Sequence, residues 1–154
     1  MKPAIIELVN RHGVKFATRD IVHKYNLEHS MGSYGHKTDA IFLNVPLIRE
    51  NKFSVQSVLL HELVHWTGGN NRLNRKFFDM YNKTGHFPNK ILEAEEELIA
   101  QLGTLELARK FHLDPIYYRK IYDHYSKRYG SVIGIDSAYI LDSVGKAVSY
   151  LFNK

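Results

Sequence analysis

The sequence contains no cysteine. The chain can therefore form no disulfide framework, thiolate zinc finger or iron–sulfur cluster, and it has no cysteine nucleophile. Any transition metal must be held by His, Asp or Glu side chains. Histidine is well represented, with nine among the 154 residues, so ligands of that kind are available.

The sequence also lacks a long apolar run. No stretch of about 18 apolar residues is present, which argues against a membrane-spanning helix. The apolar stretch at the N-terminus is short and is interrupted by Glu7, unlike a signal peptide. We therefore expect a cytoplasmic protein. Because the chain shows no linker or repeat, we expect a single domain over residues 1–154, with residues 1–33 as a helical extension.

Positive charge is in modest excess. The 21 Lys and Arg residues against 16 Asp and Glu residues give a net charge of +5. The basic residues are spread along the chain, and the pattern favours solvated helix faces. A nucleic-acid partner is therefore allowed by the charge but only weakly supported by it.

The apolar periodicity and the capping residues predict an α+β domain, mostly helical with one small sheet. Two short stretches between residues 30 and 44 predict an antiparallel hairpin. Residues 70–89 are expected to be mostly loop, with a turn at 75–81. A short helix is expected to end near Tyr25. The other helices are expected at 3–10, 55–67, 90–111, 115–129 and 136–152.

Residues 61–65 read His-Glu-Leu-Val-His. On a helix, side chains four positions apart lie one above the other on one face, so His61 and His65 can reach a single metal ion. Glu62 can approach a water molecule at the metal without being a ligand. The motif therefore predicts a metal site with Glu62 as its catalytic residue.

The helix that carries this motif is apolar on nearly all sides, which is typical of a buried helix. Burying two His and a Glu without partners would cost several kcal/mol, and a metal with its water would offset that cost. In the alternative interpretation, the histidines are core residues that hydrogen-bond nearby carbonyl groups. The apolar neighbours are Val55, Val58, Leu59, Leu60, Leu63, Val64 and Trp66.

The third ligand must come from another part of the chain. A catalytic zinc usually takes three protein ligands and leaves the fourth position open. An extended form of the motif has a third His at position 71, which is Asn here. On the expected helix 90–111, Glu97 lies at the edge of the apolar arc beside small residues, and it is the predicted ligand. The weaker candidates are Glu93 on the same stripe, then Glu95, His86 and Asp79.

The neighbours of Glu97 have expected roles as well. Glu96 points nearly opposite the apolar arc, so it is expected in water, where an acidic side chain complements the helix dipole. Gln101, one turn after Glu97, is expected to hydrogen-bond a ligating histidine. Arg72 and Arg75 are expected to pair with the glutamates. The candidate donors to a developing oxyanion are Tyr34, His36, Tyr81 and His86.

In these residues the chain resembles the metallopeptidase domain of ArdC-type antirestriction proteins, which also occurs in phage polyvalent proteins and is grouped as zincin-like. The family pattern has a Tyr, Asp-x-Ile with an apolar residue, Phe-Ser, His-Glu-x-x-His-Trp-Thr-Gly, Arg-Leu-x-Arg and Glu-Glu-Leu-x-Ala-Glu-Leu-Gly. The closing stretch 135–151 is similar to the family's last helix, so the resemblance spans residues 34–151. The motifs fall at Tyr34, 39–42, 53–54, 61–68, 72–75 and 96–103.

The resemblance implies a zincin-like fold with one zinc ion per chain, bound by His61, His65 and a Glu of the second helix, and with Glu62 catalytic. Gln101 stands where the family commonly has an acidic residue. Larger members carry an N-terminal domain that binds single-stranded DNA. The 33 residues before Tyr34 are too few for such a domain, so DNA binding is not expected to carry over.

Two functions remain open at the level of the sequence. The first is a zinc-dependent peptidase that cleaves an unknown protein target and is linked to mobile elements or antirestriction; a toxin or effector with a host target is a variant of it. The alternative is a non-hydrolytic zincin-like module that binds DNA or a host defence protein. Glu62 favours the peptidase, because a purely structural metal site does not need that residue.

Overall fold

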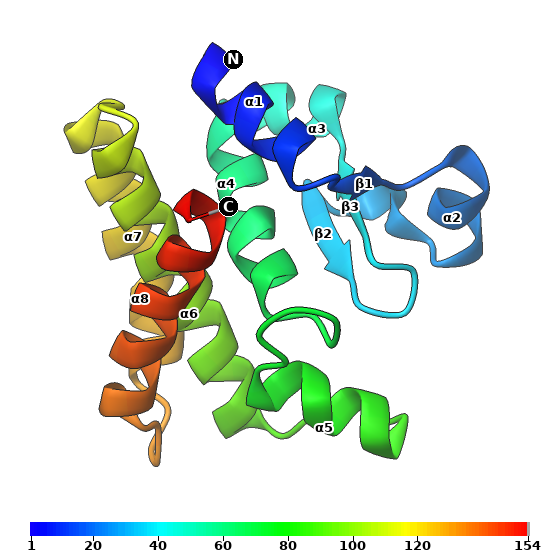
Figure 1. The fold of residues 1–154 in the computed structure, drawn as a ribbon, viewed down its shortest axis with the longest axis vertical. Helices are drawn as coiled ribbons and strands as arrows, with labels where there is room; N and C mark the ends of the chain where they lie inside the picture. The colour runs from blue at the N-terminus through cyan, green and yellow to red at the C-terminus, as the bar shows by residue number, and fades with distance from the viewer. Residues whose placement is uncertain (154) are drawn as a thin grey trace.

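The computed structural model describes residues 1–153, which form a mostly helical fold with one small sheet (Figure 1). The α+β prediction is confirmed. The elements are α1 (Pro3–Arg11), β1 (Lys15–Phe16), α2 (Arg19–Lys24), the 3-10 turn η1 (Leu27–His29), β2 (Gly32–Gly35), β3 (Ala40–Leu43), α3 (Val45–Glu50), α4 (Val55–Thr67), α5 (Lys76–Thr84), α6 (Lys90–Lys110), α7 (Pro115–Gly130) and α8 (Ser137–Phe152).

Helix α4 lies at the centre of the molecule. In Figure 1 the sheet and α2 lie on one side of α4, and α6, α7 and α8 lie on the other. Leu60, Leu63 and Val64 of α4 are no more than 1% exposed, which confirms the prediction of a buried helix. The histidine motif is therefore carried between the sheet and the helical layer, and both can contribute side chains to it.

The sheet has the strand order β1-β3-β2. β2 and β3 are antiparallel, with Gly32 opposite Leu43 and Gly35 opposite Ala40, which confirms the predicted hairpin. β1 was not predicted: it pairs parallel to β3, with Lys15 opposite Ala40. A strand of two residues is too short to show an alternating pattern. The segment expected to be a helical extension therefore also completes the sheet.

Side-chain caps mark the start of several helices at or next to the predicted boundary. Ser54, Asp114 and Asp136 each accept hydrogen bonds from backbone N–H groups of the first turn of α4, α7 and α8. Such caps satisfy amides that have no partner within the helix. The structure differs from prediction at α5, where a loop was expected. Phe78 is the buried residue of this helix, and its ring packs against those of Tyr34 and His65.

Helices α4 and α6 approach closely because of Gly103. A Cβ atom on Gly103 would lie 2.8 Å from both methyl carbons of Val64, closer than side chains pack. Gly103 thus allows the close approach of α6 together with the small residues for which it was predicted. The approach brings Glu97 within reach of the histidines. No helix among residues 1–153 is both long and apolar enough to cross a bilayer.

Candidate metal centre

The structure brings His61, His65 and Glu97 together. His61 Nε2 lies 3.2 Å from His65 Nε2, and the two oxygens of Glu97 lie 3.4 Å from His61 Nε2 and 3.3 Å from His65 Nε2. Within residues 1–153 these side chains form a group whose potential ligand atoms all lie within 4.8 Å of one another. One ion can therefore contact both Nε2 atoms and the Glu97 carboxylate.

Glu96 does not lie in water, and that prediction was wrong. Its side chain is 3% exposed, and one carboxylate oxygen lies 2.8 Å from His65 Nδ1. The prediction rested on the apolar arc of α6 alone. The loop after α4 covers the opposite side of the helix and buries Glu96 there. Because Glu96 hydrogen-bonds Nδ1, the ring of His65 is oriented with Nε2 toward Glu97. Carboxylates commonly orient metal-ligating histidines in this way.

Arg75 holds Glu96 in turn. Its Nε and Nη2 donate to the two oxygens of Glu96 at 2.8 and 2.9 Å, and its other donors reach Thr67 Oγ1 and the Val64 carbonyl at 2.8 and 2.6 Å. A two-point Arg–carboxylate pair fixes geometry as well as charge. Gly68 makes room for it, since a Cβ there would lie 2.7 Å from the guanidinium carbon.

Glu62 lies beside the cluster but does not belong to it. Its side chain is 6% exposed, and its carboxylate has no hydrogen-bond partner among residues 1–153. Gly32 of β2 allows this position, because a Cβ there would lie 2.6 Å from Val58 and 3.3 Å from Glu62 Oε2. Burial raises the pKa of Glu62 above its ordinary value, against the opposing charges of His61 and His65. Such a carboxylate is suited to accept a proton from a nearby water molecule.

The remaining ligand candidates are engaged elsewhere or exposed. Glu95 is buried and accepts a hydrogen bond from the Asp136 amide at 2.8 Å, so it holds the start of α8. Asp79 pairs with Lys83, and His86 is exposed. Glu93 lies farther along the cleft. Gln101 was expected to bond a histidine, but it hydrogen-bonds neither His61 nor His65.

A second ion pair fixes the approach of β2 to the loop after α4. Arg72 forms an ion pair with Asp39, donates to Tyr34 Oη at 3.0 Å and donates to the Trp66 carbonyl at 2.6 Å. Its guanidinium also lies 3.8 Å from the centre of the Trp66 ring. Arg72 thus pairs with an aspartate rather than with the glutamates, and Tyr34 is held in this network instead of facing the cluster freely.

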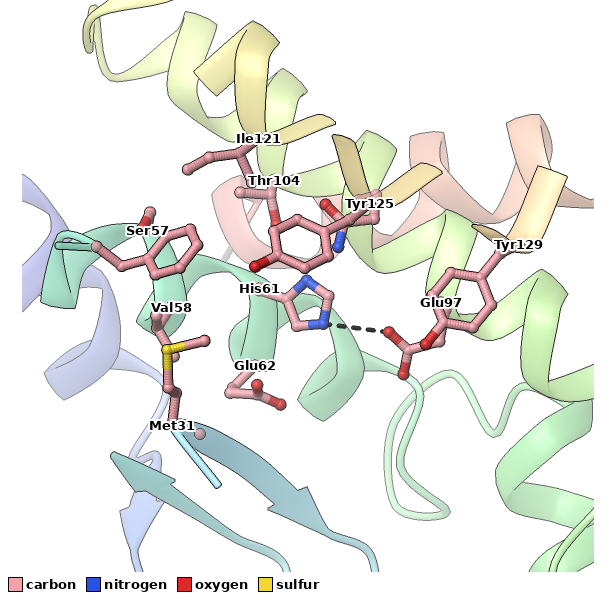
Figure 2. Close-up of a pocket in the computed structure, with 13 residues that line it drawn as sticks. Met31, Ser57, Val58, His61, Glu62, Glu97, Thr104, Ile121, Tyr125 and Tyr129 are labelled. Atoms are coloured by element: carbon pink, nitrogen blue, oxygen red, sulfur yellow. Dashed lines mark ion pairs between the residues drawn. The ribbon is translucent and has the colours of Figure 1, made fainter. Parts of the chain in front are cut away.

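Two cavities meet at the cluster. The first, here called the apolar cavity, has a volume of about 250 Å³, and Figure 2 shows it between Val58 of α4 and Ile121 and Tyr125 of α7. The second, the aromatic cavity, has a volume of about 390 Å³ and is lined by Phe77, Tyr81, Phe87 and His36. Both are lined by Gly32, His61, Glu62, Glu97 and Tyr129, so they form one cleft that passes the cluster.

The charges of the cluster fit a divalent cation. Within residues 1–153 neither Glu62 nor Glu97 pairs with a Lys or Arg. Burial would raise the pKa of Glu97, but the two histidines lower it well below its usual value. Zinc prefers His and carboxylate ligands of this kind when no thiolate is present, and its charge would balance both carboxylates. The donor set therefore fits zinc.

Comparison with known families finds a match over most of the chain. A family model described as zincin-like metallopeptidase matches residues 15–143. The chain belongs to this zincin-like metallopeptidase family. The match begins at β1, earlier than the resemblance seen from the motifs. No curated protein and no solved structure matches the chain.

Membership of the zincin-like metallopeptidase family implies a metal, typically zinc, and a peptidase fold. The family match does not identify the residues that surround the cluster and hold its side chains in place. Sequence reasoning missed the role of Glu96 and did not single out Tyr129, which lines the cleft beside Glu97 (Figure 2). The one signal for Glu96 was its place next to Glu97 at a helix already expected to carry the third ligand.

Proposed function

We propose that this zincin-like metallopeptidase holds one zinc ion through His61, His65 and Glu97 and hydrolyses peptide bonds, with Glu62 as the general base. The observation that carries the proposal is the arrangement of these four side chains. The three potential ligand atoms lie within 4.8 Å of one another, and the buried, unbonded carboxylate of Glu62 lies beside them at the meeting point of two cavities.

Glu62 performs the proton transfers in this proposal. When bound, zinc acidifies a water molecule and polarises the carbonyl group of the substrate. The Glu62 carboxylate takes the proton from the attacking water and delivers it to the nitrogen of the leaving amine. Its raised pKa strengthens it as a base, because burial destabilises the charged form.

Tyr129 is our candidate donor to the oxyanion. Burial and the negative charge of Glu97 raise the pKa of Tyr129, so its phenol keeps its proton at neutral pH. Figure 2 shows Tyr129 next to Glu97. A neutral hydroxyl at this place can donate to the negative oxygen that develops as the carbonyl is attacked. Of the earlier candidates, Tyr34 is bound to Asp39 and Arg72, and His86 is exposed.

The substrate is proposed to be a protein or peptide in an extended conformation. In the strand order β1-β3-β2, the outer edge of β2 pairs with no other strand of residues 1–153. Gly32, Ser33 and Tyr34 of this strand line the cleft. An extended peptide can add to such an edge through backbone hydrogen bonds. The resemblance to antirestriction and polyvalent proteins supports a target linked to mobile elements and host defence.

Metal analysis combined with three variants tests the proposal. Protein purified without chelator should carry about one zinc ion per chain. His61→Ala should lose the ion, whereas His86→Ala, a substitution of an exposed histidine, should keep it. Glu62→Gln should keep the ion and reduce peptide hydrolysis by about 10²–10⁴-fold. A wild-type protein without zinc, or an active Glu62→Gln variant, would contradict the proposal.

A further inference from the structure

The apolar cavity is large enough to hold the side chain of a substrate residue. Its volume is about 250 Å³, whereas a cavity of about 150 Å³ in a protein core can hold a benzene molecule. Its walls are mainly apolar or aromatic side chains: Met31, Phe53, Val58, Ile121 and Tyr125. His61, Glu62 and Glu97 also line it, so a side chain next to the bond that is cleaved lies within reach of it.

One wall of this cavity carries a polar group with no partner. Gln101 is 7% exposed and lines the cavity one helical turn from Glu97. Its side-chain amide makes no hydrogen bond with the residues that the structure describes. Its amide atoms are not among the fully buried polar atoms without a partner, so they remain accessible from the cavity to a ligand that can hydrogen-bond them. Two other polar side chains of the lining have backbone partners: Thr104 donates to the Ala100 carbonyl, and Ser57 donates to the Ser54 carbonyl.

We propose that the apolar cavity recognises an aromatic side chain of the substrate and that Gln101 favours tyrosine over phenylalanine. The ring fills the cavity between α4 and α7, and the phenolic hydroxyl hydrogen-bonds the Gln101 amide. This inference rests on the proposed peptidase function, since it places the selected residue next to the bond that is cleaved. Gln101 is therefore a specificity-determining residue, not a metal-supporting one.

The first experiment measures kcat/KM for zinc-loaded protein with peptides that differ at one position, with cleavage sites assigned by mass spectrometry. The varied residue is Ala, Leu, Phe or Tyr. It stands directly before the cleaved bond in one series of peptides and directly after it in a second series. The aromatic peptides should exceed the Ala peptide by about tenfold or more, as a filled apolar pocket does. The Tyr peptide should exceed the Phe peptide by about tenfold, as a satisfied buried hydrogen bond does.

Two substitutions separate the two parts of the inference. Ile121→Trp should fill the cavity and shift the preference toward Ala, whereas Ile116→Trp, on the same helix but 70% exposed, should leave the preference unchanged. Gln101→Leu should equalise the Tyr and Phe peptides without lowering the Phe value. A merely structural effect of Gln101→Leu would lower both values together, and equal cleavage of all peptides by wild type would overturn the inference.

Binding without catalysis distinguishes this inference from the proposed function. The N-acetyl amides of tyrosine, phenylalanine and alanine are titrated into the zinc-loaded protein and followed by NMR. Binding in that order, lost in Ile121→Trp and retained in Ile116→Trp, would support the cavity assignment even if no peptide were cleaved. In that case the proposed peptidase would fail alone. Peptide cleavage without any binding of the aromatic amides, and without aromatic preference, would overturn the cavity assignment alone.

Discussion

The two sides of the cluster formed by His61, His65 and Glu97 differ in burial and in bonding. On one side, here called the support side, His65 is backed by Glu96, Arg75 and Thr67, and the side chains of Glu96 and Arg75 are 3% and 4% exposed. On the other, the cleft side, the side chains of His61 and Glu97 are 20% and 28% exposed and face the cavities. The support side is thus closed by buried hydrogen bonds, whereas the cleft side is open to the two cavities.

Glu96 and Glu97 make the difference most clearly. They are adjacent and chemically identical, but successive side chains on a helix point about 100° apart. Glu97 therefore reaches both Nε2 atoms, while Glu96 reaches His65 Nδ1 and Arg75. The pair teaches that a carboxylate in a metal site acts as a ligand or as a support according to which histidine nitrogen it meets.

The largest effect should follow from breaking the support side at Arg75. Arg75→Met leaves the Glu96 carboxylate buried without its cation, which should lower the free energy of unfolding by about 3–5 kcal/mol. Urea unfolding measures this change. The control is Lys83→Met, which breaks the exposed pair with Asp79 and should cost at most about 1 kcal/mol. An equal decrease in the free energy of unfolding of the two variants would mean that the buried pair contributes no more to stability than the exposed one.

Glu96→Gln should weaken the metal site without removing a ligand. The amide keeps the shape of the side chain but loses the charge that orients His65, so the Kd for zinc should rise by about 10–100-fold. Competition with a chromophoric chelator measures this Kd. Glu106→Gln, on the same helix in a pair with Arg109 at the surface, should leave the Kd unchanged. An unchanged Kd in Glu96→Gln would mean that Glu96 does not support the site.

Gly68→Ala should disturb the support side by crowding. The added methyl group would lie 2.7 Å from the Arg75 guanidinium carbon, and overpacking of this kind costs about 1–3 kcal/mol. Gly145→Ala is the matched control, because no atom lies within 4 Å of a Cβ there; in helix α8 it should stabilise by about 0.5–1 kcal/mol. In thermal unfolding the midpoint temperature should fall for Gly68→Ala and rise for Gly145→Ala. A rise for both variants would refute the crowding argument.

The smallest effect concerns pH and Asp39, outside the cluster. Burial raises the pKa of Asp39, but hydrogen bonds from Arg72 and Tyr34 outweigh it, and the pKa lies below its ordinary value. The charged form thus stabilises the fold above about pH 4, and this contribution is lost as the pH falls through the folded-state pKa. Asp39→Asn should lower the urea midpoint at pH 7, with the difference from wild type shrinking below about pH 4.

Asparagine suits this test because Asp39 has a positive φ of 52°, a conformation that Asn tolerates. Asp123→Asn serves as the control, because Asp123 belongs to an exposed pair with Arg119. This control should show little difference from wild type at either pH. A difference for Asp39→Asn that is the same at pH 7 and pH 3 would rule out the charge as its cause.

The sequence predicted what local patterns encode. The i, i+4 spacing placed His61 and His65 on one face, and the small residues around Glu97 indicated the close approach of α6. Contacts between distant segments were beyond reach. Glu96 is buried because the loop after α4 covers it, β1 exists because β3 offers an edge, and the buried Phe78 of α5 packs on Tyr34 of β2. The contacts that bury Glu96, pair β1 and seat Phe78 all come from segments distant in the sequence.

The open edge of β2 has a consequence for solubility. Unpaired strand edges are where identical chains join and aggregate, and natural proteins limit this by keeping edge strands very short. β2 has four residues and begins and ends with glycine. A second copy of the chain would therefore gain few backbone hydrogen bonds by pairing there. In the proposed function the strand is long enough to align a substrate beside Glu62, while its four residues offer little for self-association.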